Sequence, residues 1–446
     1  MSVSESSMPS ISSICFVILL VAGTTLFTRN VRTITRNIRL GRDTNRNDRP
    51  QLRWKTMALV ALGQSKMVSR PVAGSMHLIV YAGFIIINIE VLEIIIDGIF
   101  GTHRIFRFLG GFYDFLIGGF EILGLLVIIA CMVFLLRRNI LKLKRFHSKE
   151  MTRWPRSDAN IILVSEIILM SLFLTMNAAD LLLQQMGTVH YVAAGAFPVS
   201  GLVAGWLQHN PEDTLVMIER VCWWGHIIGI MAFLNYVPYS KHFHIFLAFP
   251  NTWYSNLQPA GSLTNPVNVT NEVKLMLDPA AAGETPPSVP EPQRFGARDV
   301  ADLTWKQLMD AYSCTECGRC TSVCPANLTG KKLSPRKIMM DTRDRLEEVG
   351  KNIDKNKTFQ DDGKALLNDY ITPEELWACT TCNACVEACP VLIDPLSIIV
   401  DLRRFLVMEQ SSAPAELNGM FTRIENNGAP WAYGQADRLK WVEGSL

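Results

Sequence analysis

Long apolar runs alternate with basic loops along the first half of the chain. A helix of roughly 20 apolar residues spans the hydrocarbon core of a bilayer. Five runs come close to or exceed this length: 11–28, 72–96, 115–136, 159–183 and 214–237. Residues 189–207 are also apolar, but this segment is shorter and Pro198 interrupts it. We expect it to form a re-entrant or interfacial element on the outer side rather than a sixth span.

The basic residues between these runs predict the orientation. Residues 29–70 contain eleven Lys and Arg against two acids, and residues 137–157 contain eight against one. Segment 187–213 contains no Lys or Arg. Since Lys and Arg concentrate in cytoplasmic loops, we expect a multi-pass protein of the cell inner (cytoplasmic) membrane with its N-terminus outside. The first run has no basic region before it, so we expect an uncleaved helix rather than a signal peptide.

Beyond residue 250 the pattern becomes polar. Residues 251–298 are rich in Pro, Asn, Ser and Gly and are predicted to be a linker. Helical patterns resume over 299–408, whereas 409–446 has no core of its own and is expected to be a docking tail. The sequence therefore predicts an all-α protein, with a five-span helix bundle over 1–250 followed by a cytoplasmic α-helical domain.

Composition agrees with this division and narrows the class of protein. Of the 446 residues, 49% are hydrophobic and only 19% are charged, and the net charge is +2. Soluble domains carry about 25% charged residues, so part of the chain is expected to contact membrane lipid. These values exclude a disordered chain, a collagen-like fibre and a pure nucleic-acid-binding protein, and no nucleic-acid partner is expected.

Eight of the eleven cysteines form two runs with the same spacing, C-x2-C-x2-C-x3-C-P. In this bacterial ferredoxin spacing, three cysteines bind one cluster and the fourth binds the other. One [4Fe–4S] cluster is thus predicted on Cys314, Cys317, Cys320 and Cys389. The second is predicted on Cys379, Cys382, Cys385 and Cys324. Structural zinc also uses C-x2-C pairs, but a zinc site does not call for two identical four-cysteine runs that each end in Cys-Pro.

Two of the eight histidines, His77 and His226, fall inside predicted spans. An ionisable residue inside a membrane span is by default a candidate functional residue, because it is costly to bury in lipid. At 1.5 Å per residue, the two lie about 9 and 16 Å from the inner ends of their helices, close enough to ligate one b-type haem between them if the helices tilt. The alternative is that each histidine bonds to a neighbouring helix.

A second haem has weaker support. His244 follows His226 by 18 residues, five helical turns, and the only opposing candidate is Met67. Either Met67 completes this site or no residue does. The alternative, slightly favoured, is that His242 and His244 form a basic clamp at the membrane interface.

A quinone site is suggested beside the haem. Glu219 lies two turns from His226, and Asn88 lies on nearly the same face as His77. They could offer a proton acceptor and a hydrogen bond to a quinone. The alternative, that both residues make helix–helix contacts or lie at the outer interface, has equal weight. Further acids cluster toward the outer side and could form a proton path: Glu90, Glu93, Glu121 and Asp180.

These motifs together resemble a known family. The dicluster half is similar to the α-helical ferredoxin of heterodisulfide reductase and succinate dehydrogenase iron–sulfur subunits. The segments RPVAGSMH (70–77) and ERVCWWGHIIGIMAFLNYVPYSKHFHIF (219–246) resemble the cytochrome b subunit of respiratory nitrate reductase. Nearly the whole chain resembles the front part of fused iron–sulfur membrane oxidoreductases that connect electron-transfer flavoprotein to menaquinone. The segment IENNGAPWAYGQADRLKW leads into cysteine-rich CCG domains in that family, whereas this sequence contains no Cys-Cys-Gly. The resemblance implies a separate CCG-domain subunit, an electron-transfer flavoprotein, or both as partners.

The sequence therefore predicts a respiratory-chain membrane subunit of a quinone-linked iron–sulfur oxidoreductase. It would pass electrons between a cytoplasmic donor, two [4Fe–4S] clusters, haem b and the quinone pool. The alternative is a non-catalytic membrane anchor that carries clusters for a soluble partner.

Overall fold

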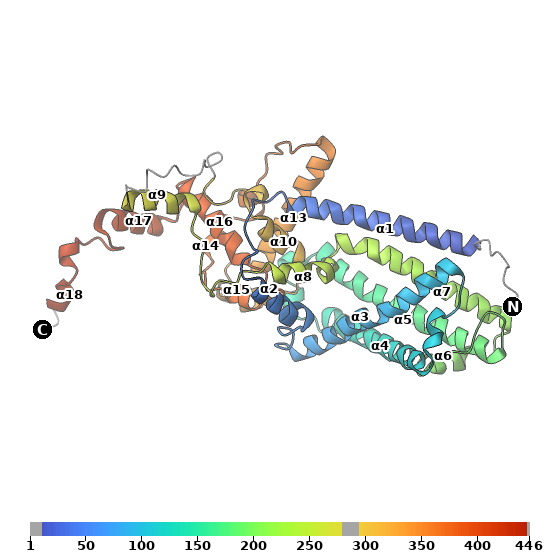
Figure 1. Ribbon diagram of the computed structural model, residues 1–446. Helices are drawn as coiled ribbons and strands as arrows, with labels where there is room; N and C mark the ends of the chain where they lie inside the picture. Colours follow the sequence, from blue (N-terminus) through green and yellow to red (C-terminus); the bar gives the residue numbers. More distant parts are fainter. Residues whose placement is uncertain (1–10, 279–293, 444–446) are drawn as a thin grey trace.

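The computed structural model describes residues 11–278 and 294–443, and in these ranges the chain is helical, with two isolated β-bridges (Figure 1). Five helices are long and apolar enough to cross a membrane, which confirms the predicted number of spans. They are α1 (Ile11–Ile38), α3 (Pro71–Phe100), α4 (Gly111–Leu135), α5 (Trp154–Met186) and α7 (Glu212–Tyr236).

Shorter helices connect the spans and build the C-terminal half. Those in the first 278 residues are α2 (Pro50–Met57), α6 (Ser200–Leu207), α8 (His244–Trp253) and α9 (Val267–Leu277). Those that follow are α10 (Trp305–Ser313), α11 (Arg319–Val323), α12 (Pro325–Leu328), α13 (Pro335–Asn356), α14 (Pro373–Trp377), α15 (Ala384–Glu387), α16 (Pro395–Met408), α17 (Ala415–Asn427) and α18 (Lys440–Glu443). Helix α9 lies inside the segment predicted to be a linker, and residues 279–293 of that segment lie outside the described residues.

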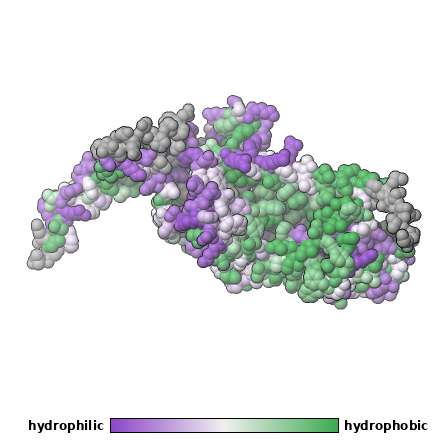
Figure 2. Space-filling view, viewed as in Figure 1, coloured by the Kyte–Doolittle hydropathy of each residue, from purple (hydrophilic) through white to green (hydrophobic). Residues whose placement is uncertain are grey.

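The spans form a bundle whose outer surface is apolar. Helix α5 packs against α4 and α7, and α1 packs against α3 and α7. Large apolar side chains such as Ile18, Phe84 and Ile129 point away from the bundle and are 40–63% exposed. Figure 2 shows this apolar surface over the spans and a polar surface over the C-terminal half. Such a band is what lipid contact requires.

The apolar segment 189–207 does not form a sixth crossing. Its chain is irregular up to α6, and it joins the end of α5 to the start of α7, so it stays at one end of the bundle. The backbone N–H groups of Val199 and Ser200 donate hydrogen bonds to the Glu121 carboxylate at 2.9 and 3.0 Å. A side chain of α4 thus satisfies backbone donors that irregular structure would otherwise leave unpaired.

Helix α1 is ten residues longer than the predicted span and joins the two halves. Its C-terminal end carries Ile34, which packs into the same buried cluster as Leu308 of the C-terminal half. The Asn37 amide donates to the Tyr312 hydroxyl at 2.9 Å, and Arg36 pairs with Asp354 at 2.6 Å. The helix continues past the apolar run because its polar C-terminal end has partners on the other half of the molecule.

The helices around the cysteines begin where the local sequence indicates. Ser334 caps α13 and Pro335 occupies its first turn, while Thr372 and Glu375 form a capping box at the start of α14. These contacts satisfy the free backbone donors of a helix N-terminus. Helix α14 leads into the second cysteine run, and both α13 and α14 pack against α16.

Candidate redox-cofactor sites

The two cysteine runs form loops of the same backbone shape. Each run begins at the end of a helix, α10 or α14, and its third cysteine lies in a short helix, α11 or α15. In both runs the residues on either side of the second cysteine have positive φ: Glu316 (54°) and Gly318 (70°), Thr381 (53°) and Asn383 (65°). This matched pair of left-handed residues turns the chain tightly around the second cysteine, as three thiolates on one cluster require.

The fourth cysteine of each run lies with the other run. Burial and the neighbouring thiolates of Cys317 and Cys314 raise the pKa of Cys389 to about 12. Burial and the neighbouring Cys379 and, more weakly, Cys324 likewise raise the pKa of Cys385 to about 12. Helices α11 and α15 pack against each other, which brings the ends of the runs together. The arrangement favours the crossed ligand sets that the spacing predicts.

Backbone hydrogen bonds and exposure distinguish individual thiols. The N–H groups of Thr381 and Ile393 donate to the sulfurs of Cys379 and Cys389 at 3.4 and 3.3 Å. Such bonds stabilise the thiolate and tune a cluster's potential. Cys382 is exposed at the surface, whereas Cys314, Cys324 and Cys385 are buried.

The first run packs on the membrane half through Arg319, which lies between two of its cysteines. The guanidinium donates to the Lys66 carbonyl at 2.8 Å and to the Ser69 hydroxyl at 3.2 Å. It also lies 3.5 Å from the sulfur of Met67. Residues 66–69 lead directly into α3, so this contact joins the first cluster loop to the helix that carries His77. Met67, predicted as a possible haem ligand, therefore has its sulfur beside Arg319.

Three histidines gather where the spans meet the C-terminal half. The ring of His77 lies 6.3 Å from that of His244, and the ring of His242 lies 5.6 Å from that of His244. The Nδ1 atom of His244 is 3.1 Å from the Lys241 carbonyl. Burial lowers the pKa of His242 to about 3 and also lowers that of His244. Burial therefore disfavours the charged form of both rings, and the interfacial clamp stays a prediction.

His226 lies apart from this group, inside the bundle on α7. It is 2% exposed, its ring contacts Phe173 at 6.1 Å, and neither ring nitrogen has a hydrogen-bond partner. A Cβ atom on Gly229 would come within 2.7 Å of Leu169, so that glycine face is closely packed. Two unpaired buried nitrogens are costly, and they fit a residue that ligates a prosthetic group. The predicted pairing of His77 with His226 stays a prediction.

A cavity of about 430 Å³ opens at the end of the bundle away from the cysteines. Glu219 lines it, and its carboxylate accepts hydrogen bonds from Tyr191 at 3.0 Å and Arg220 at 2.7 Å. Asn88, the other predicted quinone residue, is exposed on the bundle surface and bonds to the Phe84 carbonyl of its own helix. Glu219 therefore lies in the wall of a cavity, whereas Asn88 lies on the surface of the bundle.

The acids near this cavity surround Arg104, which the sequence analysis did not single out. Its guanidinium donates to Asp180 and to Asn177, both at 2.8 Å, and lies 3.6 Å from Glu90. The second carboxylate oxygen of Glu90 is buried without a partner. Glu121 instead holds the segment before α6. The available signal for Arg104 was a short loop with two arginines, Arg104 and Arg107, between spans that carry several acids.

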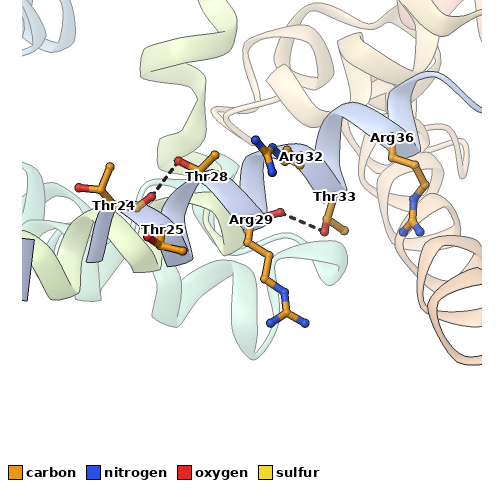
Figure 3. Close-up of a pocket in the computed structure, with 7 residues that line it drawn as sticks. All are labelled: Thr24, Thr25, Thr28, Arg29, Arg32, Thr33 and Arg36. Atoms are coloured by element: carbon orange, nitrogen blue, oxygen red, sulfur yellow. Dashed lines mark hydrogen bonds between the residues drawn. The ribbon is translucent and has the colours of Figure 1, made fainter. Parts of the chain in front are cut away.

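An open groove of about 640 Å³ follows the C-terminal half of α1 (Figure 3). Threonines line it together with Arg29, Arg32 and Arg36, and Figure 3 shows these arginines extending from the helix. Basic side chains at this level of a span are typical of the lipid headgroup region. Across residues 11–278 and 294–443, no three His, Cys, Asp or Glu side chains converge on a position for a single metal ion.

Comparison with known proteins supports the cysteine sites. Residues 313–393 match the family model of a 4Fe-4S dicluster domain. The prediction of [4Fe–4S] clusters is therefore confirmed, whereas the comparisons leave haem untested. No solved structure gives a significant match.

The relatives extend the similarity over most of the chain. A probable iron-sulfur-binding oxidoreductase, FadF, from Bacillus subtilis is 28% identical over 96% of this chain. The EtfAB:quinone oxidoreductase of Syntrophomonas wolfei is 28% identical over 90% of it. A ferredoxin/F(420)H(2)-dependent CoB-CoM heterodisulfide reductase subunit from Methanosarcina acetivorans is 37% identical over 26% of this chain, and the match covers 60% of that relative.

The chain spans 60% and 55% of the lengths of the first two relatives. The resemblance to iron–sulfur membrane oxidoreductases and to heterodisulfide reductase ferredoxins is confirmed. The chain is thus an iron–sulfur protein with membrane-spanning helices that is related to oxidoreductases.

Proposed function

We propose that the chain is the membrane electron-transfer subunit of a quinone-linked oxidoreductase. It passes electrons between a cytoplasmic donor, two [4Fe–4S] clusters, a b-type haem and the membrane quinone pool. The observation that carries this proposal is the contact of Arg319 with residues 66–69, because it seats the first cysteine run on the loop that leads to His77. When bound, the clusters and the haem supply one-electron transfer, and the chain fixes their spacing and environment.

The cysteines assigned from the sequence would hold the clusters in the crossed sets. His77 would supply one haem ligand, and His226 is the second ligand that the sequence predicts. The unpaired ring nitrogens of His226 and the unpaired Nδ1 atom of His77 support a ligand role for this residue type here. His244 is a further candidate because its ring centroid lies 6.3 Å from that of His77.

The cavity lined by Glu219 is proposed as the site of the quinone head group. Reduction of a quinone consumes two electrons and two protons, so the site needs groups that hold protons near it. The unpartnered oxygen of Glu90 and the carboxylate of Glu219 can hold a proton at this cavity. Arg104 keeps a positive charge among the acids and orients Asp180. Asn88 faces away from this arrangement and is not part of the proposed site.

The proposed topology follows from the positions of the basic residues. The N-terminus and the Glu219 cavity lie on the outer side, and the cysteine runs lie in the cytoplasm. Helix α17 carries exposed Phe421 and Ile424, with Trp431 and Tyr433 exposed beyond it. We place the docking of an electron-transfer flavoprotein or a CCG-domain subunit on this tail, beyond the cysteine runs.

The first test is to purify the protein in mild detergent and record oxidised and reduced spectra with the ratio of haem to iron. A b-type α-band that a quinol analogue can reduce is the expected result. Clusters without any haem would instead favour the alternative, an anchor whose exposed Cys382 site exchanges electrons directly with a soluble partner.

A variant tests the quinone site. Glu219→Gln removes the charge that holds Tyr191 and Arg220, and we expect the KM for a quinol analogue to rise about tenfold, equivalent to about 1.4 kcal/mol. Glu212→Gln is the matched control, because Glu212 is exposed two turns earlier on the same helix. Equal kinetics in the two variants would contradict the site.

A further inference from the structure

Two arginines on α1 have no partner within the described part of the protein. Arg29 and Arg32 are exposed, and neither side chain makes an ion pair or a hydrogen bond within residues 11–278 and 294–443. Arg36, further along the same helix, pairs with Asp354 at 2.6 Å. A guanidinium group carries five donors in a planar fork that matches carboxylates and phosphates. The first two arginines therefore have charge and donors available for an anion from outside the chain.

The face of α1 that carries these arginines changes from apolar to basic along the helix. Ile18 and Val21 are exposed, threonines follow at 24, 25 and 28, and Arg29 and Arg32 come next. These positions recur every three or four residues, so they share one face. Arg29 follows Ile18 by eleven residues, about 16 Å of helix. That length is about half of the hydrocarbon core of a bilayer, which is about 30 Å thick, and so matches the depth of one leaflet.

The threonines of the groove have used their donors within the helix. The hydroxyls of Thr24, Thr28 and Thr33 donate to carbonyls four residues earlier in α1 at 2.7, 2.8 and 3.2 Å, and the last two of these bonds are drawn in Figure 3. An anion in this groove is therefore held by the guanidinium groups. A second groove, of about 500 Å³, also borders Arg32 and includes the apolar side chain of Phe27. The surface thus has room for a charged group and for apolar chains beside it.

An aromatic side chain indicates that Arg29 lies at the level of lipid headgroups. The hydroxyl of Tyr239, an exposed residue just beyond α7, donates to the Asn30 side chain at 3.0 Å. Exposed tyrosine and tryptophan side chains are enriched where a membrane meets water. Asn30 follows Arg29 directly, so the unpaired charge lies at the depth of this tyrosine. At that depth the neighbour of an exposed helix face is lipid rather than a soluble protein.

We propose that the groove on α1 binds an anionic phospholipid from the leaflet on the side of the cysteine runs. Its phosphate lies on Arg29 and Arg32, and an acyl chain lies along Ile18 and Val21. The order of apolar, hydroxyl and basic side chains along the helix matches the order of acyl chain, ester and phosphate along a phospholipid. The site is separate from the cysteine runs and from the cavity of Glu219, so it is independent of the proposed electron transfer.

The test measures lipid binding to the full-length protein in detergent by native mass spectrometry, with cluster iron as the folding check. The wild type should bind phosphatidylglycerol, which is anionic, about tenfold more tightly than phosphatidylcholine, which has no net charge. Arg29→Gln/Arg32→Gln should remove this preference. Arg423→Gln/Arg438→Gln is the matched control and should keep it, because these two arginines are exposed beyond α16 and the change in charge is the same.

A competition experiment distinguishes a lipid site from a site for free phosphate. Inorganic phosphate should not displace phosphatidylglycerol, because burial of an acyl chain along Ile18 and Val21 adds to the affinity of the lipid. Displacement by an equal concentration of inorganic phosphate would overturn the lipid assignment. Equal binding of the two phospholipids by the wild type, or an unchanged preference in Arg29→Gln/Arg32→Gln, would mean that lipid merely solvates this helix and would also overturn it.

Discussion

At the scale of single residues, the charged side chain of Arg319 connects the first cysteine loop to the membrane half. Arg319 lies between Cys317 and Cys320. Burial lowers the pKa of its guanidinium, and the neighbouring Cys317 partly offsets this by raising it. Its guanidinium reaches residues 66–69 of the membrane half. It therefore serves as a structural contact and as a positive charge that favours the reduced cluster.

Replacing this arginine should lower the potential of the first cluster. Loss of one positive charge near a partly buried redox group costs the reduced state on the order of 1 kcal/mol, or about 40 mV for one electron. Arg319→Ala should show this decrease in an EPR-monitored redox titration. Arg319→Lys keeps the charge and should show less than half of it. Equal potentials in both variants and in the wild type would contradict this role.

The eight cysteines could be predicted because their spacing along the sequence is itself the ligand pattern of two [4Fe–4S] clusters. Arg319 and Arg104 were not, since each acts on residues that are distant in the chain: Lys66 and Ser69 for the first, Asp180 for the second. His244 was noted in the sequence, but only the folded chain brings its ring to His77. Periodicity places a residue on a helix face and cannot choose between partners on other helices.

At the scale of elements, the proposed crossed ligation gives the fourth cysteine of each loop to the cluster of the other loop. Cys382→Ala should remove the second cluster and leave about four iron atoms per chain. Adding Cys324→Ala should remove nothing more, because crossed ligation puts Cys324 on the cluster already lost. Adding Cys389→Ala instead should remove both clusters. Iron analysis and EPR distinguish these double variants, and the opposite pattern would mean that each run binds its own cluster.

The junction of α1 with α13 offers a second prediction. A Cβ atom on Gly350 would lie 2.6 Å from the amide of Asn37, which is buried and bonded to Tyr312. Gly350→Ala should therefore destabilise the dicluster half by about 1–2 kcal/mol, seen as a lower midpoint for thermal loss of cluster absorbance.

Gly419→Ala is the matched control on α17, where nothing lies within 4 Å of the added Cβ. The exchange adds helix propensity of about 1 kcal/mol there, so the midpoint should not fall. If the two variants behaved alike, α1 would not be closely packed on α13.

The number of spans followed from the sequence, while their lengths did not. Apolar runs define the part of a helix that lipid requires, and α1 continues ten residues further because Ile34 and Asn37 find partners in the C-terminal half. Helix α9 lies in a segment whose Pro, Ser and Asn content indicated a linker. Composition describes a segment on average, and a helix of eleven residues can form within it.

At the scale of the whole molecule, the bundle separates two kinds of chemistry. Cys382 is exposed on the C-terminal half, whereas the Glu219 cavity lies at the end of the bundle away from the cysteines. Figure 1 shows α17 and α18 extending beyond the dicluster half, away from the spans. The proposed sites for a soluble donor and for a quinone are therefore far apart.

Vesicles of known orientation test this arrangement. Protease added to inverted membranes should cut the tail beyond α16, because it then faces the protease, and intact right-side-out vesicles should protect it. The span region should survive in both cases, since its backbone is in lipid. Cleavage of the tail only in right-side-out vesicles would reverse the proposed topology.

The junction made by α1 also determines when the molecule can be completed. Its partners Tyr312 and Asp354 follow their α1 contacts by 275 and 318 residues. At 5–20 residues per second, a ribosome needs on the order of tens of seconds to cover that distance. During this interval α1 is already in the membrane with its inner end unpaired, and the cysteine loops are not yet made. The contacts of α1 with the C-terminal half, like that of Arg319 with residues 66–69, can therefore form only after the C-terminal partner has been synthesised.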